Sequence, residues 1–117
     1  MLKSDGRAIR SYIYISDAVS AVFYVLLNAQ SGVYNICEND NYSIRQIAEM
    51  LCELSENSNV VYKFDNSEYL KNKTSVMIGN NDNLIKLGWT KKVSIKDGLK
   101  RMIQWGIIEK ENYEYYK

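Results

Sequence analysis

A strand that runs directly into a helix, close to residue 1, is the feature that most restricts how this chain can fold. Residues 10–15, Arg-Ser-Tyr-Ile-Tyr-Ile, alternate polar and apolar side chains, which is typical of a strand. Ser16 then offers a hydroxyl as the N-cap of a helix that we expect from Asp17 to about Asn28. Because apolar side chains surround nearly the whole of that helix, we expect it to be packed on more than one side. Little of this chain is left to do that packing, so we expect that the larger part of a protein is missing.

The composition excludes several classes of protein. With 46% hydrophobic and 25% charged residues, the 117-residue chain is typical of one folded domain and not of a disordered segment. The formal net charge of +1 gives no overall field that would attract nucleic acid. No apolar run reaches the roughly 18 residues of a membrane span, and the first residues contain no apolar signal core. We therefore expect a cytoplasmic protein that makes no contact with a membrane.

The chain contains no histidine, which removes several mechanisms. Ser-His and Cys-His nucleophile pairs and most zinc sites need an imidazole, so any chemistry would have to use Tyr, Lys, Asp or Glu. The two cysteines, Cys37 and Cys52, lie on segments that we expect to be buried. Reduced core thiols are expected there, and neither a disulfide nor a metal site.

The clearest helix signal follows Ser43. The residues Ser-Ile-Arg-Gln at 43–46 have the spacing of a capping box, in which the Ser hydroxyl and the Gln side chain each satisfy a backbone N–H of the first turn. The helix they open has one apolar stripe. Its members are Ile44, Ile47, Ala48, Leu51 and Leu54.

Short strands and a polar loop are expected in the middle of the chain. Residues 33–37, Val-Tyr-Asn-Ile-Cys, predict a short buried strand, and residues 59–64 alternate like an edge strand. Residues 66–73 predict a polar loop, after which 76–78 predict another strand.

Two further helices are expected before the C-terminus. Residues 81–87 predict a brief helix that Gly88 ends, after which Trp89 packs back on the core. Ser94 begins a second capping signal, and we expect the helix it opens to turn an apolar side inward. That side consists of Ile95, Leu99, Met102 and Ile103, and Trp105 is expected in the core with Trp89. The tail, 109–117, is expected to fray.

The order of these motifs resembles a known family. The motifs are residues 10–19, Gly-Val-Tyr-Asn-Ile at 32–36, the Ser-Ile-x-x-Ile-Ala helix at 43–48, Leu-Gly-Trp at 87–89, and Ser-Ile-x-x-Gly-Leu from Ser94 with a closing Trp105. Together, from Gly6 to Trp105, they resemble the C-terminal part of the NAD-dependent epimerase/dehydratase family. These extended short-chain dehydrogenases, UDP-glucose 4-epimerase among them, act on nucleotide-activated sugars. The resemblance implies an α/β fold in which residues 1–117 form one truncated substrate-binding domain, with short strands and three or four helices.

The same resemblance shows which parts of the family's machinery this chain lacks. The family opens with a glycine-rich strand-turn-helix for the dinucleotide and later supplies a Tyr-x-x-x-Lys pair. No two of the six glycines here have the spacing of that phosphate loop. Tyr69 with Lys73, and Tyr113 with Lys117, match the pair by spacing, but with ten tyrosines such matches are expected by frequency. We expect neither to be catalytic, and we expect NAD to bind the intact family enzyme but not this chain alone.

Arg10 and Asn35 are the main candidates for substrate contacts. The resemblance implies that Arg10 helps to hold a nucleotide diphosphate, and a guanidinium offers phosphate oxygens a bidentate fork. The alternative is a structural pairing of Arg10 with Asp17 or another carboxylate. Asp17 itself favours a structural role, because a carboxylate in a first helical turn complements the helix dipole. Asn35 either donates to a ligand hydroxyl or satisfies buried backbone groups.

A second basic contact to the diphosphate, which the family commonly carries, is doubtful in this sequence. Val76 occupies the matching place, and Asn80 and Asn83 stand where an Asp and a Lys are frequent. We expect either that Lys71 or Lys73 substitutes from the preceding loop, or that half of the phosphate clamp is lost.

Three functions remain open. In the first, the chain binds a UDP-, dTDP- or CDP-linked sugar and is inactive on its own. It would then be part of an epimerase, which is an isomerase, or of a dehydratase, which is a lyase. The second is an oligomerisation module, or a module that completes a separate dinucleotide-binding chain. The third is a small nucleic-acid binder that uses a basic run opposed only by Asp97, although such a run is more commonly a solvated helix face. The run consists of Lys86, Lys91, Lys92, Lys96, Lys100 and Arg101.

Overall fold

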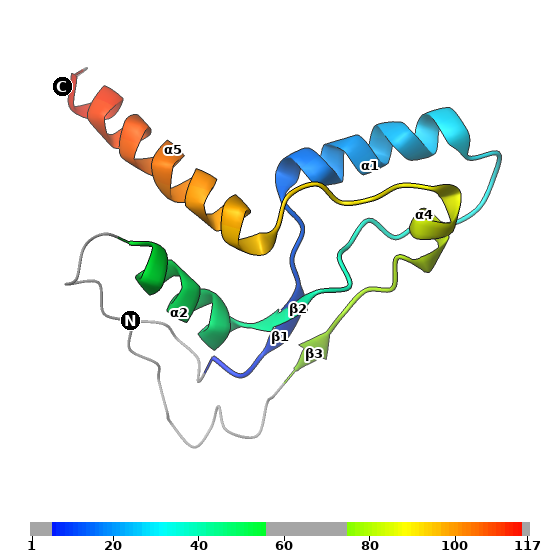
Figure 1. The fold of residues 1–117 in the computed structure, drawn as a ribbon, viewed down its shortest axis with the longest axis horizontal. Coiled ribbons are helices and arrows are strands. Elements are labelled where there is room, and N and C mark those ends of the chain that lie inside the picture. The colour runs from blue at the N-terminus through cyan, green and yellow to red at the C-terminus, as the bar shows by residue number, and fades with distance from the viewer. Residues whose placement is uncertain (1–5, 56–74, 116–117) are drawn as a thin grey trace.

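The described part of the chain has an α/β fold, with one small sheet and helices that extend away from it (Figure 1). The computed structural model describes residues 6–55 and 75–115, with side chains described up to residue 110. The described part contains three strands and four helices, as expected for the fold class (Figure 1). Within these ranges no helix is long and apolar enough to cross a membrane. The radius of gyration, 17.6 Å, exceeds the roughly 13 Å typical of a compact domain of this length, so the elements are openly arranged.

The sheet has β1 at its centre. Strand β1 (Ile9–Ser11) pairs antiparallel with β2 (Asn41–Ser43) and parallel with β3 (Val76–Met77). Arg10 lies opposite Tyr42 on one side and Met77 on the other. The strand predicted for residues 10–15 is therefore confirmed only at its start. Residues 12–14 leave the sheet because the antiparallel register would place them opposite residues 38–40, which precede β2 and form no strand, and because β3 has only two residues.

Helix α1 (Ile15–Asn28) begins earlier than predicted. Its N-cap position is Tyr14, whose carbonyl accepts from the backbone N–H groups of Asp17 and Ala18 at 3.0 Å. Ser16 lies inside the first turn, so the prediction that Ser16 caps this helix is wrong. The helix has no side-chain cap, and its start is determined by the chain's exit from the sheet.

Helix α1 packs on one side only. It meets α4 (Asp82–Leu87), and Ala21, Leu84 and Trp89 form the buried cluster between them. The described residues do not supply the packing predicted for the other sides of α1, in line with the expectation that little of this chain is left to cover them. The bare side carries large apolar residues, which we call the α1 apolar face. Its members are Ile15, Val19, Val22, Phe23, Leu26 and Leu27.

The strand predicted for residues 33–37 is absent from the structure. Three asparagine side chains hold this segment in place of a strand ladder. Asn81 Nδ2 donates to the Cys37 carbonyl at 2.8 Å, Asn83 Nδ2 to the Val33 carbonyl at 3.1 Å, and Asn35 Nδ2 to the Asn80 carbonyl at 3.0 Å. Alternation of apolar residues detects an extended backbone, but it cannot show whether the partner is another strand or a set of amide side chains.

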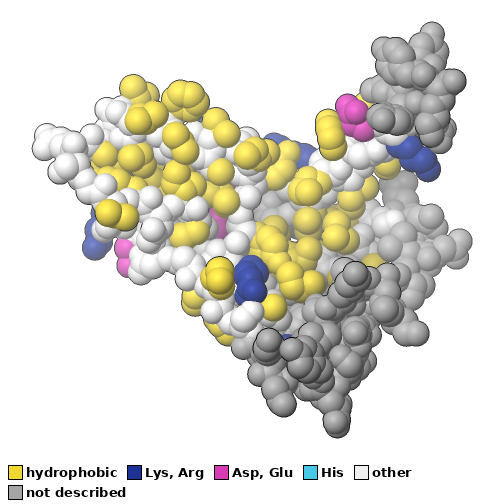
Figure 2. Space-filling view, turned by 180° about the vertical axis from the view of Figure 1, so that it is seen from behind, with side chains coloured by type: hydrophobic (Ala, Val, Ile, Leu, Met, Phe, Trp, Pro, Cys, Tyr) yellow, Lys and Arg dark blue, Asp and Glu magenta, His cyan; other side chains and the backbone are white. Residues whose placement is uncertain are grey.

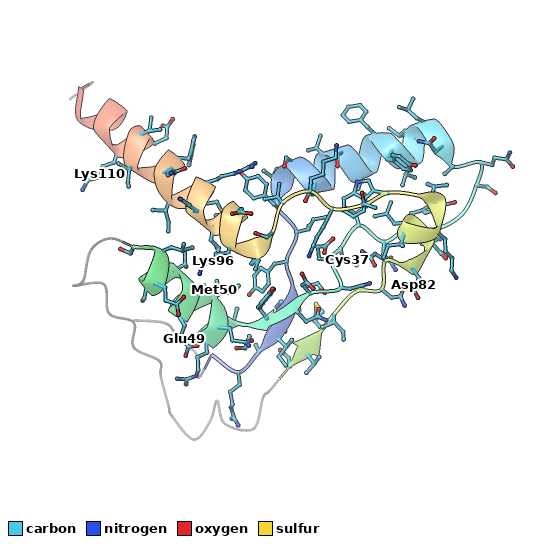
Figure 3. All side chains as sticks on the ribbon, viewed as in Figure 1. Cys37, Glu49, Met50, Asp82, Lys96 and Lys110 are labelled. Atoms are coloured by element: carbon cyan, nitrogen blue, oxygen red, sulfur yellow. The ribbon has the colours of Figure 1, made fainter. Side chains whose placement is uncertain are left out.

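Helix α2 (Ile44–Leu54) confirms the predicted capping box. Ser43 Oγ accepts from the Gln46 backbone N–H at 3.1 Å, and the Ser43 N–H donates to Gln46 Oε1 at 2.8 Å. The helix packs against α5 (Ile95–Tyr115), and Figure 3 shows Met50 and Lys96 where the two helices approach each other. The predicted apolar stripe of α2 is half-buried.

The end of α4 confirms the prediction, whereas α5 corrects it in part. Gly88 ends α4 in the left-handed region at φ +110°, and Trp89 is buried, as expected. Of the apolar side predicted for α5, Leu99 is buried, while Met102 is 60% exposed, and Trp105 is 65% exposed. Trp105 is therefore not a core residue of this chain, because α5 points away from the body (Figure 1). The helix continues to Tyr115, into the segment for which we expected fraying.

Candidate functional site

Arg10 extends from the central strand and is anchored by its neighbours. Its Nη1 donates to the carbonyls of Ile9 at 2.7 Å and Ser75 at 2.9 Å, and its Nη2 donates to Ser75 Oγ at 2.7 Å. Ser75 directly precedes β3, and its carbonyl also accepts from the Ile9 backbone N–H at 3.1 Å. Ser75 therefore ties the Arg10 side chain and the β1 backbone to one point at the edge of the sheet.

These bonds leave part of the guanidinium unused. A guanidinium has five N–H donors, and the three bonds to Ile9 and Ser75 use both hydrogens of Nη1 and one of Nη2. The donors that remain are Nε–H and one Nη2–H, which lie along the other edge of the planar group. No carboxylate pairs with Arg10 among the described residues, so the alternative pairing of Arg10 with Asp17 is wrong.

The pKa of Tyr12 depends on the charge of Arg10. The two residues are two positions apart, so they project from the same side of an extended chain. Burial raises the pKa of Tyr12 above its ordinary value, and the Arg10 cation opposes part of that rise because it favours the phenolate. The Tyr12 phenol is therefore harder to ionise than an ordinary tyrosine, and its pKa depends on the charge of Arg10.

Asp17 lies in the first turn of α1, as predicted, and has a second structural role. Its carboxylate is 3% exposed, and Oδ2 accepts from the backbone N–H groups of Lys92 at 3.1 Å and Val93 at 2.9 Å. These bonds fix the segment that leads into α5. A carboxylate that would complement the dipole of its own helix thus also holds a chain segment 75 residues away.

Asn35, the second candidate for a substrate contact, is exposed and has an intramolecular partner. Its amide donates to the Asn80 carbonyl, while Asn80 itself exchanges two hydrogen bonds with Asp82 through its side chain. Val76, which occupies the place of the second basic residue, is exposed in β3. Of the cations predicted for the clamp, Arg10 lies on the sheet, and Lys71 and Lys73 lie outside the described residues.

Sequence reasoning missed a pocket that the residues after Cys37 help to line. The pocket measures about 310 Å³, and its lining includes Glu38, Asp40, Asn81, Trp89 and Lys91. Lys91 Nζ lies 3.0 Å from Glu38 Oε2 and also contacts Asp40. The hydrogen bond with Asp40 raises the pKa of Lys91, burial opposes this, and Glu38 adds to the rise. Glu38, Asp40 and Lys91 converge only through tertiary folding, so no spacing in the sequence predicts this pocket.

Asn81 is the least expected member of that pocket. It occupies the N-cap position of α4 and makes no side-chain capping bond. Its amide donates to Cys37 instead, and its buried Oδ1 has no partner. The side chain of an asparagine at an N-cap normally accepts a hydrogen bond from a backbone N–H of the first helical turn. Asn81 instead stabilises the 33–38 segment and leaves the first turn of α4 without a side-chain cap.

The basic run does not form a free cationic surface. Lys91 pairs with Glu38 and Asp40, Lys96 lies 4.0 Å from Glu53, and the Arg101 guanidinium lies 5.6 Å from the centre of the Tyr14 ring. Three of its six cations therefore have partners, which weakens the case for nucleic acid.

The structure does not test the remaining Tyr and Lys candidates. Tyr69, Lys73 and Lys117 lie outside the described residues, as does the side chain of Tyr113. Cys37 and Cys52 are free thiols, and burial, with a contribution from Glu38, raises the pKa of Cys37. Within the described ranges no group of three or more Cys, Asp or Glu side chains is arranged to hold a metal ion.

Comparison with known proteins identifies relatives of this chain, although no protein-family model matches it. Human dTDP-D-glucose 4,6-dehydratase is 28% identical over 121 residues, which cover 99% of this chain and 34% of that protein.

Solved structures agree in fold. The enzyme WbmF from Bordetella bronchiseptica, in complex with NAD+ and UDP, is similar with a TM-score of 0.77 and 24% identity, over 98% of this chain and 33% of that one. UDP-N-acetylglucosamine 4-epimerase from Methanobrevibacter ruminantium M1, in complex with UDP-N-acetylmuramic acid, has a TM-score of 0.77 and 17% identity, over 92% of this chain and 34% of that one. The chain thus spans about a third of the length of these proteins.

Proposed function

We propose that this chain, whose relatives are nucleotide-sugar dehydratases and epimerases of the NAD-dependent epimerase/dehydratase family, binds the nucleotide diphosphate for such an enzyme. The resemblance to that family, predicted from five motifs, is confirmed by these relatives. They match it over a partial region, so the activity of a whole enzyme is not attributed to this chain.

The observation that carries the proposal is the unused edge of Arg10. Nε–H and one Nη2–H remain on a permanent cation that stands on the central strand. Two parallel N–H donors match two oxygens of a phosphate, which is the strongest common form of phosphate recognition by a side chain. Arg10 would therefore bind one phosphate of a UDP-, dTDP- or CDP-linked sugar, and Lys71 or Lys73 would complete the clamp.

We also propose that this chain does not bind NAD on its own. A dinucleotide pyrophosphate needs a glycine-rich turn between strand and helix, because only glycine lets the backbone approach closely. Here the turn from β1 to α1 is Tyr12-Ile13-Tyr14. We therefore propose that a different polypeptide segment binds NAD and contains the catalytic Tyr-x-x-x-Lys pair. We also propose that this chain alone converts no substrate. The free thiols support a reducing compartment, so a cytoplasmic location is part of the proposal.

Calorimetric titration of the 117-residue chain with UDP, dTDP, CDP and inorganic pyrophosphate tests the proposal. We expect binding that depends on the diphosphate, that uridine does not reproduce, and that Arg10→Ala weakens by tenfold or more. Asn35→Ala is the second variant, and a loss of binding would show that Asn35 contacts the nucleotide. Equal binding by the wild type and Arg10→Ala would show that Arg10 does not hold the ligand. Interconversion of nucleotide sugars by the purified chain would refute the proposal that the chain alone is inactive.

A second function, as a module that binds another polypeptide, is favoured by the α1 apolar face. Leu27 is 82% exposed, and hydrophobic side chains gather over α1 in the view of Figure 2. The face continues through Ile15 into a groove of about 480 Å³ that Tyr14, Met102 and Trp105 also line. A contiguous apolar surface of this kind is typical of an interface. We propose that its occupant is an NAD-binding polypeptide equivalent to the two thirds of the relatives that this chain does not match, and that self-association is the alternative.

Analytical ultracentrifugation separates these possibilities. The chain is measured alone and after mixing with the unmatched part of human dTDP-D-glucose 4,6-dehydratase. We expect a 1:1 complex that the double substitution Phe23→Glu with Leu27→Lys prevents. Lys110→Glu, on the far part of α5, is the control. If the chain stays monomeric and does not bind the second polypeptide, the proposed NAD-binding partner is refuted. A dimer whose fraction rises with protein concentration supports self-association.

A further inference from the structure

Ser75 holds the Arg10 guanidinium with two different oxygen atoms. Its carbonyl accepts from Nη1 at 2.9 Å and its hydroxyl accepts from Nη2 at 2.7 Å. One residue thus occupies the terminal edge of the guanidinium with two bonds, in the way a carboxylate would, but without its negative charge. The charge of Arg10 is therefore not neutralised by the group that orients it.

The position of Ser75 is itself determined by the sheet. Its carbonyl accepts from the Ile9 backbone N–H, and the next residue, Val76, begins β3 beside Ile9. Arg10 also folds back on the Ile9 carbonyl through Nη1. The guanidinium plane is thus fixed relative to two paired strands, and Nε–H and the second Nη2–H form its free edge.

We propose that Ser75 is a positioning residue that preorganises Arg10, so that this free edge is presented to a phosphate. The inference rests on the proposed function, because it takes the diphosphate as the ligand of Arg10. Its physical basis is conformational. A free arginine side chain loses rotamer entropy when it binds, whereas one that is already held loses little. The Ser75 hydroxyl contributes orientation without competing charge.

An opposite outcome is also physically possible, which makes the inference testable. If the Ser75 hydroxyl competed with the phosphate for the same donors, its removal would free Nη2 and tighten binding. The geometry argues against competition, because the phosphate would use the edge that Ser75 leaves open.

The test is calorimetric titration of inorganic pyrophosphate into the full chain carrying Ser75→Ala. This change removes the Oγ bond and leaves the bond to the Ser75 carbonyl. We expect binding to weaken roughly fivefold, the factor that corresponds to one ordinary hydrogen bond, with no shift in thermal unfolding. Ser75→Thr keeps a hydroxyl and should restore most of the affinity. Ser31→Ala, at an exposed serine in the turn after α1, is the matched control and should bind as the wild type does.

A double-mutant cycle separates positioning from a general structural effect. In an Arg10→Lys background the fork is gone, so Ser75→Ala should cause no further loss. Unchanged or tighter binding by Ser75→Ala, in a protein whose binding Arg10→Ala weakens, would overturn the positioning role and leave the proposed function intact. Binding that is insensitive to Arg10→Ala would overturn the proposed function itself, because the ligand would then not be held by Arg10.

Discussion

Asp17 should carry more of the stability of this fold than any exposed charge. Its buried Oδ2 accepts from the backbone N–H groups of Lys92 and Val93, which would otherwise lack a partner in a half-buried position. An unpaired backbone donor costs about 1–3 kcal/mol, so Asp17→Ala should lower the free energy of unfolding by about 3 kcal/mol. Asp17→Asn keeps an acceptor oxygen but loses the charge, and we expect it to cost about 1–2 kcal/mol.

The assay is urea unfolding followed by circular dichroism. A domain has a total stability of about 5–15 kcal/mol, so Asp17→Ala should move the midpoint far to lower urea, with Asp17→Asn between it and the wild type. Asp97→Ala is the control, because Asp97 is an exposed carboxylate in the first turn of α5 whose partner is Ser94, and it should cost less than about 1 kcal/mol. If Asp17→Ala unfolded within about 0.5 kcal/mol of the wild type, or if Asp17→Asn were the worse of the two, the argument from buried backbone donors would fail.

Three further outcomes are expected. Arg10→Ala should raise the pKa of Tyr12 further above its ordinary value, because it removes the cation that favours the phenolate. A pH titration of the assigned Tyr12 ring signals by NMR measures this, and a fall in the pKa would contradict it. Gly88→Ala should lower the free energy of unfolding by about 1–2 kcal/mol, because φ is +110° and the new Cβ would lie 2.8 Å from the Tyr24 hydroxyl. Thermal unfolding measures this loss, and an unchanged midpoint would contradict the prediction. Cys37 should react more slowly with iodoacetamide at pH 8 than the same thiol in the urea-unfolded chain, because burial raises the pKa of Cys37 and leaves less thiolate. Equal reaction rates would refute this prediction.

Capping chemistry explains where sequence reasoning succeeded. The hydrogen bonds of the Ser43 and Gln46 capping box lie within four residues, so local sequence is enough to predict them. The same holds for Gly88, whose left-handed conformation ends α4 wherever the helix packs. In both cases the interaction partners are neighbours in the chain.

The errors have a common physical cause, which is that the partner lies far away in the sequence. Residues 33–37 have the apolar alternation of a strand, yet side chains from 81 and 83 hold their carbonyls. Ser16 has the chemistry of an N-cap, but the exit from the sheet begins the helix at Ile15. Trp105 follows helical periodicity, but the part of α5 that carries it meets no described residue that would bury it. Periodicity shows which side of an element is apolar and does not show what will cover it.

The candidate site shows the same division. The resemblance to the relatives and the α/β class could be predicted from motifs whose residues are close together in the chain, and the role of Arg10 stays a prediction. The orientation of Arg10 could not, because it depends on Ser75, which is 65 residues away. Nor could the structural use of Asp17 or the contact of Glu38 and Asp40 with Lys91, since each joins segments that only folding brings together. Local sequence determined the helices and their ends because those interactions span a single turn, whereas the tertiary structure decided which donors of Arg10 are occupied, which remain free, and which side of α1 stays bare.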